Sequence, residues 1–294
     1  MNKIPVRHKW EPYLWLLPST VLMTVFVIIP IIIVFRLSFS SISKSGVVGG
    51  FIALENFRDA FADPAITVVA LNTVIWVFSI VCLATLTGFA LAMALNVKFA
   101  GRKIVRLIVL LPWSTSLVCQ AYVWNYIINY EYGSLNNVLL NLGFVSHAVN
   151  FRPDYHTEFI WECGVGIFVT VPFVCFTVLA ALQSIDNAYY EAATVDGAGF
   201  WSKLRHVTIP LVKPALTATT VTNIIYVFNS FTIIYTMTKG APANKTDIMV
   251  TLLYMRAFYD NQKGVATALS VIGFVALCIV AAIYMIITMR REDD

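Results

Sequence analysis

The sequence predicts an all-α membrane protein with six transmembrane helices. Of its 294 residues, 59% are hydrophobic and only 12% are charged, and the mean hydropathy is +0.77. A soluble domain is typically about 45–50% apolar and about 25% charged. The composition therefore excludes a soluble enzyme and a disordered chain. The net charge of +4 is too small and too dispersed to indicate a nucleic-acid partner.

Intervals without charged residues locate the helices, because a charge at the bilayer centre costs about 2.5–3.5 kcal/mol. Six such intervals hold 23 or more residues. The spans predicted from them are about 12–36, 71–96, 106–130, 162–185, 214–238 and 264–289. A seventh interval, 132–151, contains four asparagines and a histidine, and we interpret it as a loop with short helical pieces. None of the apolar runs alternates in polarity, as barrel strands do.

Each span has features of its own. The first interval holds 24 residues, against about 7–15 in the apolar core of a signal peptide, so we expect a retained helix. The second is longer than a bilayer requires, and its helix should begin near Leu71. We expect Pro112 and Pro172 to interrupt the third and fourth helices, and Pro210 and Pro214 to bracket the start of the fifth.

The distribution of basic residues orients the chain. With both termini in the cytoplasm, the inside segments hold 12 Lys and Arg in 53 residues, and the outside segments hold 8 in 85. This asymmetry obeys the positive-inside rule. The short loop 98–106 contributes four of the inside charges.

Catalytic signatures are missing from the sequence. It has no zinc-protease, nucleophile-elbow or phosphate-loop motif. His147 and His156 lie near acidic residues, but we interpret that region as a solvated loop. We therefore expect no catalytic residue, no metal site and no cofactor in this chain. The spans also carry no mid-membrane ionisable relay, so we expect the energy source to lie outside the membrane domain.

The loop 186–213 has the most distinctive pattern. Residues 189–195 favour a helix, Gly197 and Gly199 permit a sharp bend, and 200–207 resume the helical pattern. Phe200 and Trp201 add apolar bulk in a loop that should face water, which usually marks a contact surface.

Here the sequence resembles a known family. Residues 191–198 read Glu-Ala-Ala-Thr-Val-Asp-Gly-Ala, and 207–210 read Val-Thr-Ile-Pro. Together they resemble the EAA motif of ABC importer permeases, in which Ile and Leu replace Val207 and Ile209. Segments 54–57, 72–73, 111–113 and 238–242 are similar to elements of the maltose-type sugar permeases, although Ala241 stands where a second glycine is commoner. The short length resembles the six-helix members.

The resemblance implies a single transmembrane permease domain, 1–294, in the cytoplasmic (inner) membrane of a bacterium or archaeon. Its partners would be a second homologous permease, two ATP-binding-cassette subunits that hold ATP and Mg, and a periplasmic or extracellular solute-binding protein. The loop would dock on one ATPase and move with it. The residues implied in docking are Glu191, Ala192, Ala193, Asp196, Gly197 and Ala198.

The third, fourth and fifth spans carry more polar and aromatic residues than lipid contact requires. Asn223, Val227 and Ser230 share one helix face, and Tyr226 flanks it. The resemblance places sugar contacts near Trp113, Thr170, Phe173, Asn223, Val227 and Ser230. Polar packing between helices is the alternative role for any one of them.

Sugar or oligosaccharide import is the leading hypothesis. An ABC permease for glycerol 3-phosphate, an amino acid or a polyamine remains open, although the six intervals hold no charged side chain to match such solutes. A secondary transporter would move solute without ATP. A membrane-anchored enzyme is the reading with least support.

Overall fold

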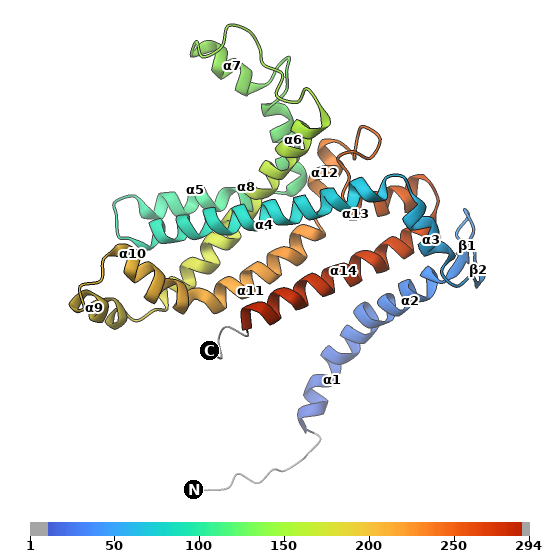
Figure 1. The fold of residues 1–294 in the computed structure, drawn as a ribbon, viewed down its shortest axis with the longest axis horizontal. Coiled ribbons are helices and arrows are strands. Elements are labelled where there is room, and N and C mark those ends of the chain that lie inside the picture. Colours follow the sequence, from blue (N-terminus) through green and yellow to red (C-terminus); the bar gives the residue numbers. More distant parts are fainter. Residues whose placement is uncertain (1–10, 290–294) are drawn as a thin grey trace. The chain divides into compact units, whose positions relative to one another are not determined.

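The computed structural model describes residues 11–289 and is mainly helical (Figure 1). In that range, five helices are long and apolar enough to cross a membrane, or six if one sharply bent pair counts as a single span. The predicted all-α membrane class is confirmed. The contacts divide the chain into two compact units, 11–63 with Leu253–Gly273 and Pro64–Leu252 with 274–289. The prediction of one domain over 1–294 stays a prediction.

The first unit contains a long apolar helical segment followed by a small hairpin and shorter helices. Its elements are α1 (Glu11–Met23), the π turn η1 (Thr24–Ile28), α2 (Ile29–Ser38), β1 (Ser40–Ile42), β2 (Val48–Phe51), α3 (Glu55–Ala62), η3 (Met255–Tyr259) and the first part of α14 (Lys263–Met289). The antiparallel β1–β2 hairpin was not predicted. Asn56 Nδ2 holds it by donating to the carbonyls of Ser38 and Ser40, at 2.9 and 3.0 Å.

An ion pair closes the first unit. Arg256 Nε donates to Asp63 Oδ2 at 2.6 Å, and Arg256 Nη1 donates to Asp260 Oδ2 at 2.5 Å. The hydrogen bond to Asp63 raises the pKa of the Arg256 guanidinium above its ordinary value. The two segments of this unit are therefore joined by a charged contact between η3 and the residue that follows α3.

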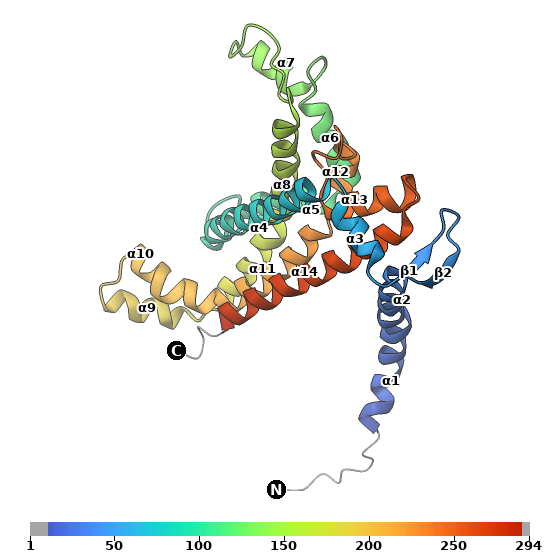
Figure 2. The same ribbon diagram turned by 45° about the vertical axis from the view of Figure 1, so that its right-hand side comes forward.

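The second unit holds most of the helices. They are α4 (Ile66–Asn96), α5 (Arg102–Ser114), α6 (Leu117–Ile127), α7 (Ser134–Asn141), α8 (Tyr155–Gln183), α9 (Asn187–Val195), α10 (Phe200–Lys203), the π turn η2 (Leu204–Thr208), α11 (Ile209–Phe228), α12 (Thr232–Met237) and α13 (Met249–Tyr254). In Figures 1 and 2, α7 and α9 lie at opposite ends of α8. The helix α8 therefore separates the segment that contains α7 from the loop that contains α9.

Small residues let α4 and α8 pack closely. A Cβ on Gly88 of α4 would lie 2.7 Å from Val174 Cβ, and a Cβ on Gly166 of α8 would clash with Ile80 Cδ1. Helices in a bilayer gain their association mainly from such close packing. The buried core of the second unit lies along this contact.

Two predicted spans are broken. The third, 106–130, consists of α5 and α6, which meet at 100° across Thr115 and Ser116. The fifth, 214–238, is interrupted at 229–231 between α11 and α12. The helices of the second and fourth spans begin earlier than expected, at Ile66 and Tyr155.

Pro210 and Pro214 lie near the start of α11, as predicted, with Pro210 in its first turn. Pro172, in contrast, does not interrupt the fourth helix, because α8 is unbroken from Tyr155 to Gln183. Helical structure is continuous from Phe200 to Phe228, through Pro210 and Pro214. A proline ring in a helix clashes with the carbonyl four residues earlier. For Pro210 that carbonyl belongs to His206, inside the wider π turn η2, which relieves the clash.

One of the family-like segments, 72–73, holds the loop before α13 against α4. Asn72 Nδ2 donates to the carbonyls of Lys245 and Asp247, at 2.8 and 3.0 Å. The amide of Met249 donates to Thr73 Oγ1 at 2.9 Å. These contacts give the segment 72–73 a structural role.

Candidate functional site

The loop after α8 forms a helix, a glycine turn and a helix, in the predicted order. The Asp186 side chain caps α9 by accepting from the amide of Ala188 at 3.0 Å. At the other end, the amide of Ala198 donates to the carbonyl of Ala193 at 2.8 Å, and the amide of Gly197 donates to that of Thr194 at 3.0 Å. This pair of bonds is a Schellman motif. It requires the left-handed backbone that Gly197 adopts, with φ +77°.

Most of this loop faces away from its own chain. None of the α9 residues is buried, and Val195 is 88% exposed. Phe200 and Trp201 on α10 are 63% and 77% exposed. Of the residues predicted to dock, Glu191, Ala192, Asp196 and Gly197 are exposed, and Ala193 and Ala198 are half-buried. Exposed apolar side chains gathered at one end of a molecule usually mark a contact surface.

Five of the seven residues predicted to bind substrate line one cavity of about 160 Å³. The complete lining is Trp113, Val169, Thr170, Phe173, Thr222, Asn223 and Tyr226. No lining residue is charged. The sequence analysis missed Val169 and Thr222, yet Val169 lies one turn before Phe173 on α8, and this spacing predicts a shared face.

Aromatic rings and one amide give this inner cavity its chemistry. The Trp113 and Phe173 rings lie 6.2 Å apart at 44°. Asn223 is 2% exposed, and its Nδ2 has no hydrogen-bond partner among the residues that the structure describes. A buried amide without a partner is costly, which makes it a donor available to a ligand.

The other two predicted residues lie outside the cavity. Val227 is 1% exposed and belongs to the core, where its carbonyl accepts from Trp76 Nε1 at 3.0 Å. Ser230 lies in the break after α11, and its amide donates to that same carbonyl at 3.1 Å. An unbroken helix would have kept Ser230 on the face of Asn223.

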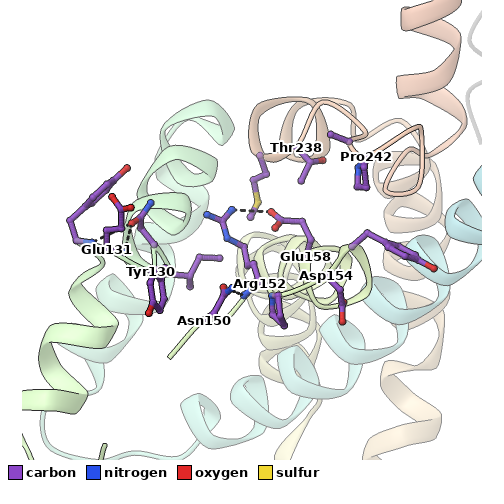
Figure 3. A pocket seen from close by; sticks show the side chains of 15 residues that line it. Tyr130, Glu131, Asn150, Arg152, Asp154, Glu158, Thr238 and Pro242 are labelled. Carbon is purple, nitrogen blue, oxygen red and sulfur yellow. Dashed lines mark hydrogen bonds and ion pairs between the residues drawn. The ribbon is translucent and has the colours of Figure 1, made fainter. Parts of the chain in front are cut away.

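A second, larger cavity of about 790 Å³ lies beside the start of α8 (Figure 3). Its polar wall includes Arg152, which donates to Glu158 Oε1 at 2.9 Å and to Asn125 Oδ1 at 2.7 Å. Asp154 caps α8, and the backbone hydrogen bond from Thr157 lowers the pKa of its carboxyl below the ordinary value. Three tyrosines, Tyr130, Tyr132 and Tyr155, complete this outer cavity.

Glu162 lies next to the outer cavity and was expected at the edge of a span. It is instead fully buried in α8, and Thr238 Oγ1 donates to its Oε1 at 2.6 Å. Thr238 also lines the outer cavity (Figure 3). The segment 238–242 is thus held to α8 by this carboxyl group.

Comparison with known proteins identifies the family. Residues 84–292 match the model of the binding-protein-dependent transport system inner membrane component. The chain belongs to this family. The permease is 38% identical over 289 residues to a probable ABC transporter permease protein of Brucella suis, covering 98% of this chain and all of that one. It is 30% identical over 292 residues to the trehalose/maltose transport system permease protein of Thermococcus litoralis, covering 99% and 98%.

The fold of the permease also matches a solved structure. That structure is of a bacterial alginate ABC transporter in complex with alginate pentasaccharide-bound periplasmic protein. The TM-score is 0.81 at 23% identity, over 96% of this chain and 94% of that chain. The predicted membership of the ABC importer permeases is confirmed, and the permease is a multi-pass component of a transport system.

Proposed function

We propose that the permease moves a sugar or short oligosaccharide across the cytoplasmic membrane by alternating access, driven by ATPase subunits. The observation that carries this proposal is the inner cavity, with its aromatic pair, its uncharged lining and the unpartnered amide of Asn223. Sugars stack their C–H faces on rings and exchange hydrogen bonds with neutral groups. The trehalose/maltose relative supports the same class of solute.

The inner cavity holds only part of a substrate. Sites for drug-sized ligands are about 300–1,000 Å³, and this one is about 160 Å³. A single sugar ring suits that volume, with a second permease supplying the facing wall. Trp113 and Tyr226, 54% and 45% exposed, lie open toward such a wall.

The proposal extends to the remaining partners. The exposed residues of α9 and α10 would contact an ATP-binding-cassette subunit, which holds ATP and Mg, and Glu191 would make charge-assisted bonds there. The outer cavity would face the solute-binding protein. With the ATPase contact on the cytoplasmic side, both termini would also lie in the cytoplasm, in agreement with the distribution of basic residues. The termini themselves lie outside the described residues.

Other solutes have less support. The inner cavity has no Arg or Lys in its lining for the phosphate of glycerol 3-phosphate, and no carboxylate for a polyamine. Membership of a binding-protein-dependent family also disfavours a secondary transporter.

Reconstitution of the complete complex tests the function. In vesicles with its partner permease, two ATPase subunits and the binding protein, labelled sugar should accumulate only when ATP is present. The purified chain alone should hydrolyse no ATP. Uptake without ATP, or turnover by the clean chain, would refute the proposal.

Replacing Asn223 with Leu tests the substrate face of α11. A lost neutral hydrogen bond is worth about 0.5–1.5 kcal/mol, so uptake should fall roughly three- to tenfold while the yield of intact complex persists. Thr219→Val is the matched control, because its hydroxyl donates within α11, to the carbonyl of Ala215 at 2.7 Å. If Asn223→Leu lowers complex yield instead, the residue packs helices together. Unchanged uptake and yield would remove it from the site.

A further inference from the structure

Helix α9 has little packing on its own chain, although it carries part of the loop's exposed surface. None of its residues is buried. Two side-chain hydrogen bonds connect it to the next segment. Tyr190 Oη lies 3.1 Å from Thr208 Oγ1, and Lys203 Nζ donates to Thr194 Oγ1 at 2.8 Å. α9 lies beside α10 in both views (Figures 1 and 2).

Two further bonds close these links into a ring. Thr194 Oγ1 donates to the carbonyl of Tyr190 at 2.6 Å, and Thr208 Oγ1 donates to the carbonyl of Lys203 at 3.3 Å. A threonine hydroxyl has one proton. Because Thr208 uses its proton on Lys203, Tyr190 is the donor in the bond between Tyr190 and Thr208. Each of the three hydroxyls therefore donates once, and both threonine hydroxyls also accept.

One member of the ring, Thr208, lies directly before α11. Thr208 is 2% exposed and closes the π turn η2, from which α11 continues without a break. Asn223 lies fifteen residues further along this helix, about 22 Å away at 1.5 Å per residue. π turns inside helices occur frequently at functional sites. The ring thus fastens the exposed helix α9 to the helix that lines the inner cavity.

We propose that the four-residue ring of Tyr190, Thr194, Lys203 and Thr208 fixes α9 to the foot of α11, so that movement of an ATPase subunit reaches the solute cavity. The four are positioning residues, since they act through the docking surface without themselves contacting solute or nucleotide. This inference rests on the proposed contact between α9 and the ATPase. Without the ring, α9 would tilt on its glycine turn, and hydrolysis would be partly uncoupled from transport.

The test removes one hydroxyl from each side of a single bond. Tyr190→Phe and Thr208→Val should each lower the ratio of solute imported to ATP hydrolysed by about two- to tenfold in the complete reconstituted complex. The ATPase subunits should still copurify with the chain. Thr217→Val is the control, because its hydroxyl donates to the carbonyl of Lys213, at 3.0 Å, within α11. This control should keep the original ratio.

The double variant Tyr190→Phe with Thr208→Val should be no worse than the poorer single variant, because both remove the same bond. A ratio that stays at the original value in both single variants would overturn the ring proposal while leaving docking intact. Loss of complex yield in Thr208→Val, with Tyr190→Phe normal throughout, would make the contact merely structural and also overturn it. Failure of the unaltered chain to bind ATPase subunits would instead refute the proposed function.

Discussion

Uptake by a complex carrying Gly197→Pro is expected to fall about a hundredfold. Gly197 has φ +77°, whereas proline fixes φ near −65°, and proline also lacks the amide hydrogen that bonds to the carbonyl of Thr194. A misplaced proline costs about 3 kcal/mol, and each 1.4 kcal/mol is tenfold in an equilibrium constant. The turn that orients α9 toward the ATPase would be lost. ATP-dependent uptake in reconstituted vesicles measures the effect, with ATPase copurification as the second readout.

Two alanine variants provide a graded control. A Cβ on either Gly197 or Gly199 meets no atom within 4 Å, so neither variant creates a clash. Only Gly197 has a left-handed backbone, which costs other residues about 1–2 kcal/mol. Gly197→Ala should therefore reduce uptake partially, and Gly199→Ala, with φ −74°, should transport normally. Normal coupling in the Gly197→Pro complex would contradict the role of this turn.

The membrane class and the helix–turn–helix loop were predictable because both depend on local sequence. Charge-free intervals reveal where a chain can lie in lipid, and a glycine after a helix reveals a turn. The breaks at 115–116 and 229–231 were not predictable in the same way. At the second break the carbonyl of Val227 accepts a hydrogen bond from Trp76 on another helix, and a contact between residues so far apart in sequence leaves no periodic signal.

The part of the candidate site that depends on local sequence was predicted, and the part that depends on distant contacts was not. Helix spacing brought Asn223 and Tyr226 together, and the family resemblance indicated Trp113, Thr170 and Phe173. Ser230 was misplaced because the face was extended through a helix that ends at Phe228. Glu162 was overlooked because a carboxylate at the edge of an apolar interval suggests exposure, whereas Thr238, 76 residues away in sequence, covers it.

Trp76→Ala is expected to be the most destabilising single change in the second unit. The Trp76 side chain is fully buried in the core, its ring lies 6.2 Å from that of Phe159, and its Nε1 donates to the carbonyl of Val227 at 3.0 Å. Removing a buried tryptophan costs about 3–5 kcal/mol, through lost contacts and the cavity left behind. The bond to Val227 adds about 0.5–1.5 kcal/mol. The loss would loosen the contact of α4 with the end of α11. This contact is at Val227, one turn after the Asn223 of the inner cavity.

Denaturant titration of the purified chain in detergent, followed by circular dichroism, measures the change in the free energy of unfolding. Trp76→Phe should cost less than Trp76→Ala, because it keeps a ring in the core and loses the indole donor. Trp15→Ala is the matched control, since Trp15 on α1 is 83% exposed and its truncation should leave the unfolding midpoint unchanged. Equal midpoints for Trp76→Ala and Trp15→Ala would show that the α4 contact contributes little to stability. In that case the break after α11 would have to be held by its own backbone bond from Ser230 to Val227.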